Sequence, residues 1–211
     1  MQSEFIVLRK TPYRENALVL SGISPDFGKL EVIAYGAAGS SKPNSFPVAD
    51  IYRVLSVTLK DNDLEQGKNG LLAAKDIELI EDFPDLPRKL DNLKFIGKIG
   101  GFLLRNTVFE SPLPLVYDAL RSLLRILSNN EVWSQREAAI VIKLTFLYEN
   151  GLLPEPENMS AEAAGKVMML YEKIIECAVD AEPLPKLSVE YYLQLDSYLN
   201  MLITRNQLPW R

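Results

Sequence analysis

The chain of 211 residues contains no histidine and a single cysteine, and both facts restrict its chemistry. Without histidine it cannot build a Ser-His-Asp or Cys-His catalytic centre, and it lacks the commonest side-chain base near neutral pH. Cys177 has no second cysteine with which to form an intramolecular disulfide or a Cys-rich zinc site. It lies in the apolar helical stretch LYEKIIECAV, so we interpret it as a small core residue.

An excess of positive charge and long apolar segments are also missing. The 28 acidic residues outnumber the 23 basic ones, so the formal net charge of −5 provides no overall basic field for nucleic acid. No uncharged apolar stretch approaches the ~18 residues that a bilayer-spanning helix needs. The start MQSEFIVLRK contains an apolar run too short for a signal peptide. With cysteine nearly absent, we expect a cytoplasmic protein with no membrane contact.

The first eighty or so residues show the two-residue period of β-strands. Segments rich in Ser, Pro, Asp, Asn and Gly separate the apolar runs, as turns do. The five predicted strands are Glu4–Arg9, Ala17–Ile23, Lys29–Tyr35, Ala49–Leu59 and Leu71–Ile80. Five short antiparallel strands suit a small closed barrel, because closure removes exposed strand edges. We assign residues 1–83 to this barrel.

After the turn Phe83-Pro-Asp-Leu-Pro87 the apolar period becomes that of helices. The five predicted helices are Lys89–Thr107, Pro114–Ser128, Ser134–Glu149, Ala161–Val179 and Ser188–Arg205. Residues 88–211 are therefore predicted to form an all-helical bundle. The expected fold class is α+β with two domains, a five-stranded β-barrel followed by the bundle.

Several short motifs occur in a recognisable order along the chain. The first half contains Tyr13-Arg-Glu15-Asn16, then Phe27-Gly28-Lys29-Leu30, then Gly36-Ala37 after a predicted strand. The second half contains the helix end between Ile142 and Pro154 and the closing segment Tyr198–Arg205. Taken together, their order and spacing resemble those of the RecO family of bacterial DNA repair and recombination mediators. The resemblance spans nearly the whole chain and implies that the barrel is an OB-fold.

This resemblance also implies a function. RecO proteins are understood as non-enzymatic, cytoplasmic and nucleoid-associated mediators that bind single-stranded DNA and anneal strands. RecR-like and single-strand-binding-protein (SSB)-like proteins are the implied partners, with no small-molecule substrate. Many members carry a four-cysteine zinc site where this chain has Pro154-Glu-Pro-Glu-Asn-Met-Ser160, so we expect no zinc and no cofactor.

One departure from the family pattern bears on DNA binding. The Gly-Ala-Arg of the family is Gly36-Ala37-Ala38 in this chain, so an arginine is replaced. Together with the acidic net charge, this keeps open an alternative, a RecO-fold protein-interaction module that has lost DNA binding. An enzyme is a third alternative, whose remaining chemistries are paired carboxylates, Ser-Lys dyads or carboxylate-bound Mg²⁺.

Single-stranded DNA requires basic residues and aromatic stacking platforms. The barrel candidates for DNA binding are Arg9, Lys10, Arg14, Lys29, Lys42 and Arg53, and the candidates for base stacking are Tyr13, Phe27 and Tyr35. On the first predicted helix, Lys94, Lys98 and Arg105 share one face and are candidates to extend the track. The alternative is a solvated surface of mixed charge with the aromatic rings in the barrel core.

The implied contact with the acidic, aromatic-ended tail of SSB requires positive charge around an apolar pocket. The candidates in the bundle are Arg121, Arg125, Arg136 and Lys143. Basic residues at such positions are also common as ordinary solvent-exposed charges on helices, and the sequence leaves both interpretations open.

Overall fold

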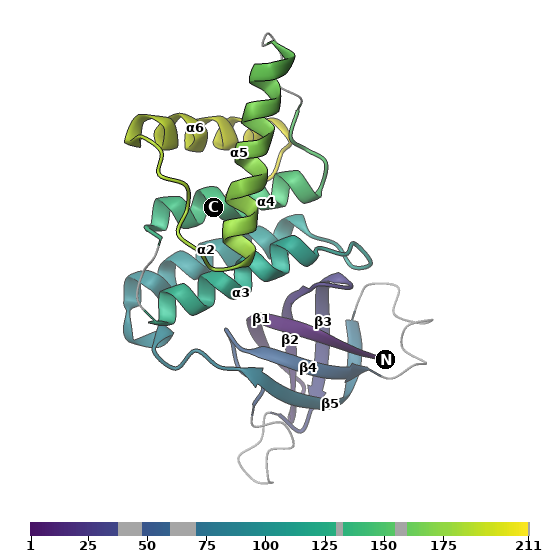
Figure 1. Cartoon of the computed structure of the whole chain (residues 1–211). Helices are drawn as coiled ribbons and strands as arrows, with labels where there is room; N and C mark the ends of the chain where they lie inside the picture. Colours follow the sequence, from purple (N-terminus) through teal and green to yellow (C-terminus); the bar gives the residue numbers. More distant parts are fainter. Residues whose placement is uncertain (38–47, 60–70, 130–132, 155–159, 211) are drawn as a thin grey trace.

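The structure is a computed structural model, and it describes residues 1–37, 48–59, 71–129, 133–154 and 160–210. A β-barrel occupies one end of the molecule and the helices stack on it in successive layers (Figure 1). Two helices, α2 and α3, lie against the barrel, α4 lies beyond them and α6 beyond α4, while α5 runs from the far end of the molecule down to α3 (Figure 1). No helix in the described ranges is long and apolar enough to cross a membrane.

Five strands form the barrel and close it in the order β1-β2-β3-β5-β4. Their bounds are β1 (Gln2–Tyr13), β2 (Ala17–Ser24), β3 (Gly28–Tyr35), β4 (Val54–Leu59) and β5 (Leu71–Glu81). Neighbouring strands are antiparallel, apart from the parallel pair β3 and β5. This order and closure are those of an OB-fold, and the predicted fold class is confirmed.

The predicted strand over 49–53 was wrong, because β4 begins only at Val54. Tyr52 has a φ of 58°, a left-handed conformation that a strand cannot contain. The preceding turn is fixed instead by β1, since the Tyr52 N–H donates to the Val7 carbonyl at 2.7 Å. β1 is longer than predicted, because its hairpin with β2 continues to the pair Tyr13–Ala17.

Alternate residues of the strands face two different cores. Phe5, Leu20 and Val32 fill the barrel interior, whereas Ile6 and Ile23 face outward and pack in the same core as the helices. The outer face of β1 and β2 is therefore covered by helices where these strands pass the bundle.

The helices agree closely with the sequence-based prediction. They are α2 (Leu90–Asn106), α3 (Pro114–Asn129), α4 (Gln135–Glu149), α5 (Ala161–Val179) and α6 (Val189–Arg205), preceded by the 3-10 turn η1 (Leu86–Arg88). Ser134, Ser160 and Ser188 cap α4, α5 and α6, each accepting a backbone N–H in the first turn.

Charged contacts also join the bundle to the barrel. On α3, Arg121 lies 3.0 Å from the Glu4 carboxylate of β1 and 2.8 Å from that of Glu81 at the end of β5. Arg125 pairs with Glu81 at 2.6 Å, and the Tyr117 hydroxyl donates to Glu4 at 2.6 Å. Burial and the Glu4 carboxylate both raise the pKa of Tyr117 far above its usual range, so Tyr117 remains a donor.

Candidate nucleic-acid interface

The register of the first three strands brings predicted residues onto one face of the sheet. Arg9 of β1 pairs with Ser21 of β2, which pairs with Glu31 of β3. Farther along, Tyr13 pairs with Ala17, which pairs with Tyr35. Paired residues share a face, and residues two or four apart along a strand share it too. Both rows therefore lie on the outer side of the sheet, opposite the barrel interior.

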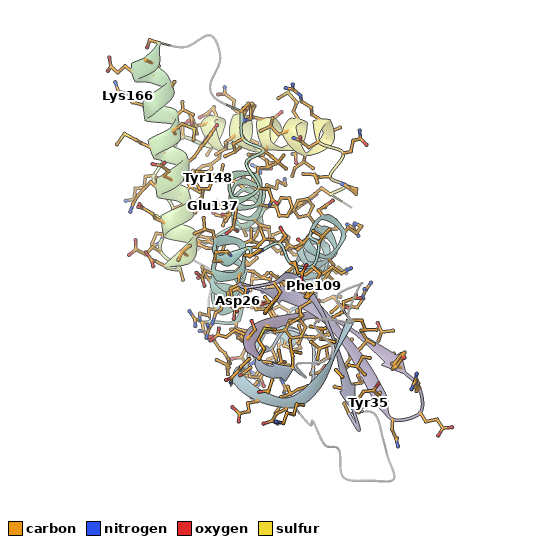
Figure 2. The ribbon with its side chains drawn as sticks, turned by 90° about the vertical axis from the view of Figure 1, so that its right-hand side faces the viewer. Asp26, Tyr35, Phe109, Glu137, Tyr148 and Lys166 are labelled. Carbon is orange, nitrogen blue, oxygen red and sulfur yellow. The ribbon has the colours of Figure 1, made fainter. Side chains whose placement is uncertain are left out.

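Two aromatic rings mark the far end of this face. Tyr35 is 45% exposed and lies at the end of the barrel away from the helices (Figure 2). Tyr13 is half-buried, and the guanidinium of Arg14 lies 5.0 Å from the centre of its ring. Arg14 stands in the hairpin turn with a φ of 55°. The five residues Arg9, Tyr13, Arg14, Lys29 and Tyr35 are called the outer sheet face below.

A single carboxylate lies between two of these cations. Glu31 is 3.3 Å from the Arg9 guanidinium and 3.7 Å from the Lys29 ammonium. It also accepts a hydrogen bond from the Ser21 hydroxyl at 3.0 Å. Two cations that converge on one acidic side chain form an anion-binding geometry, which Glu31 occupies in this structure.

The third predicted aromatic residue lies elsewhere. Phe27 belongs to the turn between β2 and β3, and its ring stacks on Phe109 with centroids 5.9 Å apart and planes inclined by 17°. Phe109 lies at the end of the barrel that faces the helices (Figure 2). One face of the Phe27 ring is therefore covered, while Tyr13 and Tyr35 remain as the aromatic pair of the outer sheet face.

Lys10 and Arg53 lie apart from the outer sheet face. Lys10 pairs with Leu20, whose side chain faces the barrel interior, and its ammonium contacts Asp50 at 2.5 Å. Burial raises the pKa of the Asp50 carboxyl, but hydrogen bonds from Lys10 and the Ile51 N–H and the charges of Lys10 and Arg53 together outweigh this and lower it overall. Arg53 contacts Asp82 at 3.0 Å. Asp50, Arg53 and Asp82 line a cleft of about 400 Å³ between the barrel and the start of α2.

The helical stripe has the predicted orientation in part. Lys94 and Lys98 are exposed on α2, while Ile96 and Ile99 on its opposite side are buried. Arg105 differs, because its guanidinium donates to the Pro209 carbonyl at 3.5 Å. Lys42 and Ala38 lie outside the described residues.

The structure does not gather the four candidates for the SSB contact. Arg121 and Arg125 hold Glu4 and Glu81 at the junction of barrel and bundle, and Arg136 is exposed in the first turn of α4. Lys143 is buried in the bundle, where its ammonium donates at 2.8 Å to the side chains of Asp196 and Asn200 on α6. The ring of Trp210 lies 4.6 Å from that ammonium.

Sequence reasoning did not identify Glu31, Glu4 or Glu81 as partners of these cations. All three stand at outward positions of strands, where a carboxylate in contact with water is common. Apart from Lys29 and Glu31, which are neighbours on β3, the pairs join residues between 22 and 117 positions apart, so no local spacing marks them. Within the described ranges, no group of three or more His, Cys, Asp or Glu side chains is placed to hold a metal ion.

Comparison with known proteins gives a consistent but distant similarity. No protein-family model matches the chain. It is 26% identical over 179 residues to the proteins named DNA repair protein RecO of Listeria monocytogenes, Listeria welshimeri and Listeria innocua. The matched region covers 85% of this chain and 60% of those relatives, so the chain spans about three fifths of their length.

Proposed function

We propose that this chain is a RecO-like DNA repair protein that binds single-stranded DNA on the outer sheet face. The observation that carries the proposal is the shared face of Tyr13, Tyr35 and three cations on an OB-type barrel. OB barrels bind single strands with basic grooves and aromatic rings that stack on bases. The similarity to RecO proteins supports DNA repair as the setting.

In the proposed complex, bases stack on the two tyrosines. β1 and β3 are separated by β2, so the backbones at Tyr13 and Tyr35 lie about 10 Å apart. That separation suits two bases of an extended single strand better than neighbouring bases of a duplex, which are 3.4 Å apart along each strand. Each base stacked on an aromatic ring contributes roughly 1–3 kcal/mol.

Phosphates are proposed to contact Arg9, Arg14 and Lys29. Glu31 competes for two of these cations, so a phosphate must displace it. The exposed ammonium groups of Lys94 and Lys98 are proposed to extend the track on α2. Neutralising phosphates lowers the repulsion between two strands, which is the physical basis for strand annealing by this protein.

The remaining parts of the proposal follow from the similarity alone. We propose that the protein acts without catalysis, in the cytoplasm at the nucleoid, and with RecR-like and SSB-like partners. Of the four residues proposed for the SSB tail, Arg121, Arg125 and Lys143 already bind carboxylates of this chain. Arg136 is the exposed residue to test first, with a labelled acidic tail peptide and the Arg136→Ala variant.

The test of DNA binding is fluorescence anisotropy of a labelled single-stranded oligonucleotide at several salt concentrations. Tyr35→Ala is expected to weaken binding about fivefold or more with an unchanged salt slope. Arg9→Ala is expected to lower the slope of log K against log salt by about 0.7, the contribution of one phosphate on a single strand. Glu31→Gln is expected to tighten binding, because it frees two cations.

Lys166→Ala is the control, since Lys166 is an exposed lysine on α5, far from the barrel (Figure 2). Equal affinities for wild type and for both the Tyr35 and the Arg9 variants would contradict the proposed face. Binding that is unaffected by salt would contradict the phosphate contacts.

A second candidate is a RecO-fold protein-interaction module without DNA affinity. The observation in its favour is that Arg9, Lys10, Lys29 and Arg53 each have a carboxylate of the same chain within 2.5–3.7 Å. The same titration separates the two candidates. No binding by the wild type at low salt supports the interaction module and excludes the DNA role.

A further inference from the structure

Helix α6 carries apolar side chains on the face that points away from the core. Leu195, Leu199 and Leu202 of α6 are buried in the bundle. On the opposite side, Val189 is 65%, Leu193 46% and Met201 52% exposed. With Ser197 between them, these residues recur every four positions and form one continuous ridge. The ridge Val189–Leu193–Ser197–Met201 is called the α6 ridge below.

The position of α6 leaves this ridge accessible. α6 packs on α4, and α4 lies between α6 and the helices that touch the barrel (Figure 1). The α6 ridge therefore points away from the barrel, in the direction in which the first half of α5 extends past α6 (Figures 1 and 2). The proposed DNA-binding face is at the other end of the molecule. Three exposed apolar side chains along one line of a helix make this line a candidate interaction surface.

The charges beside the ridge identify the partner that it fits. Glu190 stands in the first turn of α6 and Arg205 in the last turn, and both are exposed. At 100° per residue both fall on the same side of the mean direction of the ridge, and Arg205 lies four positions after Met201, in line with the ridge itself. Two copies of α6 that pack antiparallel about a two-fold axis bring matching flanks together, with opposite ends of the helices side by side. Glu190 then meets Arg205 of the second copy, twice.

The centres of the apolar and the charged positions lie half a residue apart. Leu193 and Met201 are symmetric about Ser197, and Glu190 and Arg205 are symmetric about a point between Ser197 and the next residue. An antiparallel register centred on Ser197 pairs Leu193 with Met201 of the second copy and places Arg205 of the second copy opposite Val189, one residue from Glu190. Ser197 is small, so it permits the two helices to approach closely at the axis.

We propose that the α6 ridge is a self-association surface, on which a second copy of this chain packs with its α6 antiparallel. The interface is isologous, and a single exposed helix from each copy gives it an area at the low end of specific interfaces, below about 1,200 Å². The resulting dimer is weak, with a dissociation constant on the order of 10–100 µM. The proposal is independent of DNA binding.

The test is sedimentation velocity of the whole protein from about 5 to 500 µM. The expected result is a rise in mass from 23.8 kDa towards twice that value. Leu193→Glu is expected to weaken the dimer at least about tenfold, because it places a carboxylate in the apolar contact of each copy. Leu90→Glu is the matched control and leaves the dimer unchanged, since Leu90 is 64% exposed on α2 beside the barrel.

A charge exchange tests the register. Glu190→Arg alone and Arg205→Glu alone each create two like-charge contacts, and each is expected to weaken the dimer about fivefold. The double variant restores opposite charges and is expected to return to within about twofold of the wild type. Circular dichroism at 222 nm checks that each variant keeps its helices.

Three results would overturn the proposal. A mass that stays at 23.8 kDa up to 500 µM excludes self-association on the ridge. A dimer that Leu193→Glu leaves intact places the interface elsewhere. A double charge exchange that remains as weak as the single variants excludes the antiparallel register.

Discussion

The buried lysine of the bundle leads to an asymmetric prediction about stability. Lys143 of α4 and Asp196 of α6 form an ion pair at 2.8 Å in which the lysine side chain is 4% exposed and the aspartate side chain 26% exposed. The two partners therefore differ in their access to water when one of them is removed. We expect Asp196→Ala to destabilise the fold more than Lys143→Met.

The magnitude follows from the partners that remain. Removing one partner of a buried ion pair costs about 3–5 kcal/mol when the other is left uncompensated. After Asp196→Ala the ammonium keeps the Asn200 oxygen and the Trp210 ring, so the expected loss is about 3 kcal/mol, the lower end of that range. After Lys143→Met, water reaches the aspartate and the methionine fills the space of the lysine stem, so we expect about 1–1.5 kcal/mol.

The assay is urea unfolding followed by circular dichroism, with an unchanged m-value as the condition for comparing midpoints. Lys166→Met is the matched control, because its ion pair with Glu162 is as short, at 2.6 Å, but both side chains are more than 70% exposed. Its expected effect is below about 0.5 kcal/mol. A loss from Lys143→Met equal to or greater than that from Asp196→Ala would refute the argument from desolvation.

Two further predictions concern the barrel and its junction with the bundle. Burial raises the pKa of Glu81, but hydrogen bonds from two arginines of α3 outweigh this and lower it overall. Glu81 therefore stabilises the fold above its unfolded pKa of about 4.3, and this stabilisation is lost as pH falls through the lower folded pKa. We therefore expect Glu81→Gln to cost stability at pH 7 and little at pH 3, measured as urea midpoints; an equal cost at both values would contradict this linkage. A Cβ added at Gly22 would lie 1.8 Å from the Ile6 carbonyl oxygen, so Gly22→Ala should destabilise by about 3 kcal/mol. A Cβ added at Gly165 on α5 would have nothing within 4 Å, so Gly165→Ala should instead stabilise by about 0.5–1 kcal/mol. If both variants changed the free energy of unfolding in the same direction, the steric argument would be contradicted.

The elements were predictable because their signals are local. Ser134, Ser160 and Ser188 each cap the helix that begins at the next residue, and α5 has the predicted bounds. The start of β4 was not predictable, because the alternation over 49–53 looks like a strand while contacts with β1 impose a turn. The side chain that caps α3 is distant in sequence, because the Glu149 carboxylate accepts hydrogen bonds from the N–H groups of Leu115 and Val116 at 2.8 Å.

The candidate site also has one part that the sequence predicted and another that depends on the folded sheet. Cations and tyrosines near the first hairpin were identified from their residue types alone. Which of them share a face depends on the register of three strands, and a shift of one residue would turn every side chain to the other face. Arg9 and Lys10 have the same charge and, as neighbours on a strand, point to opposite sides, and the bulge between Val7 and Arg9 decides that Arg9 is the one on the outer side.

By itself the sequence determined the order of strands and helices, the caps, the apolar faces and the exclusion of histidine and disulfide chemistry, since these depend on composition and on residues within a turn or two of one another. Tertiary structure alone decided which carboxylates meet Arg9, Arg121 and Lys143. Glu31 beside Arg9, Glu81 beside Arg121 and Asp196 beside Lys143 all lie on separate elements. An ion pair forms only within about 4 Å, and chain folding, not sequence spacing, brings such distant residues within that range.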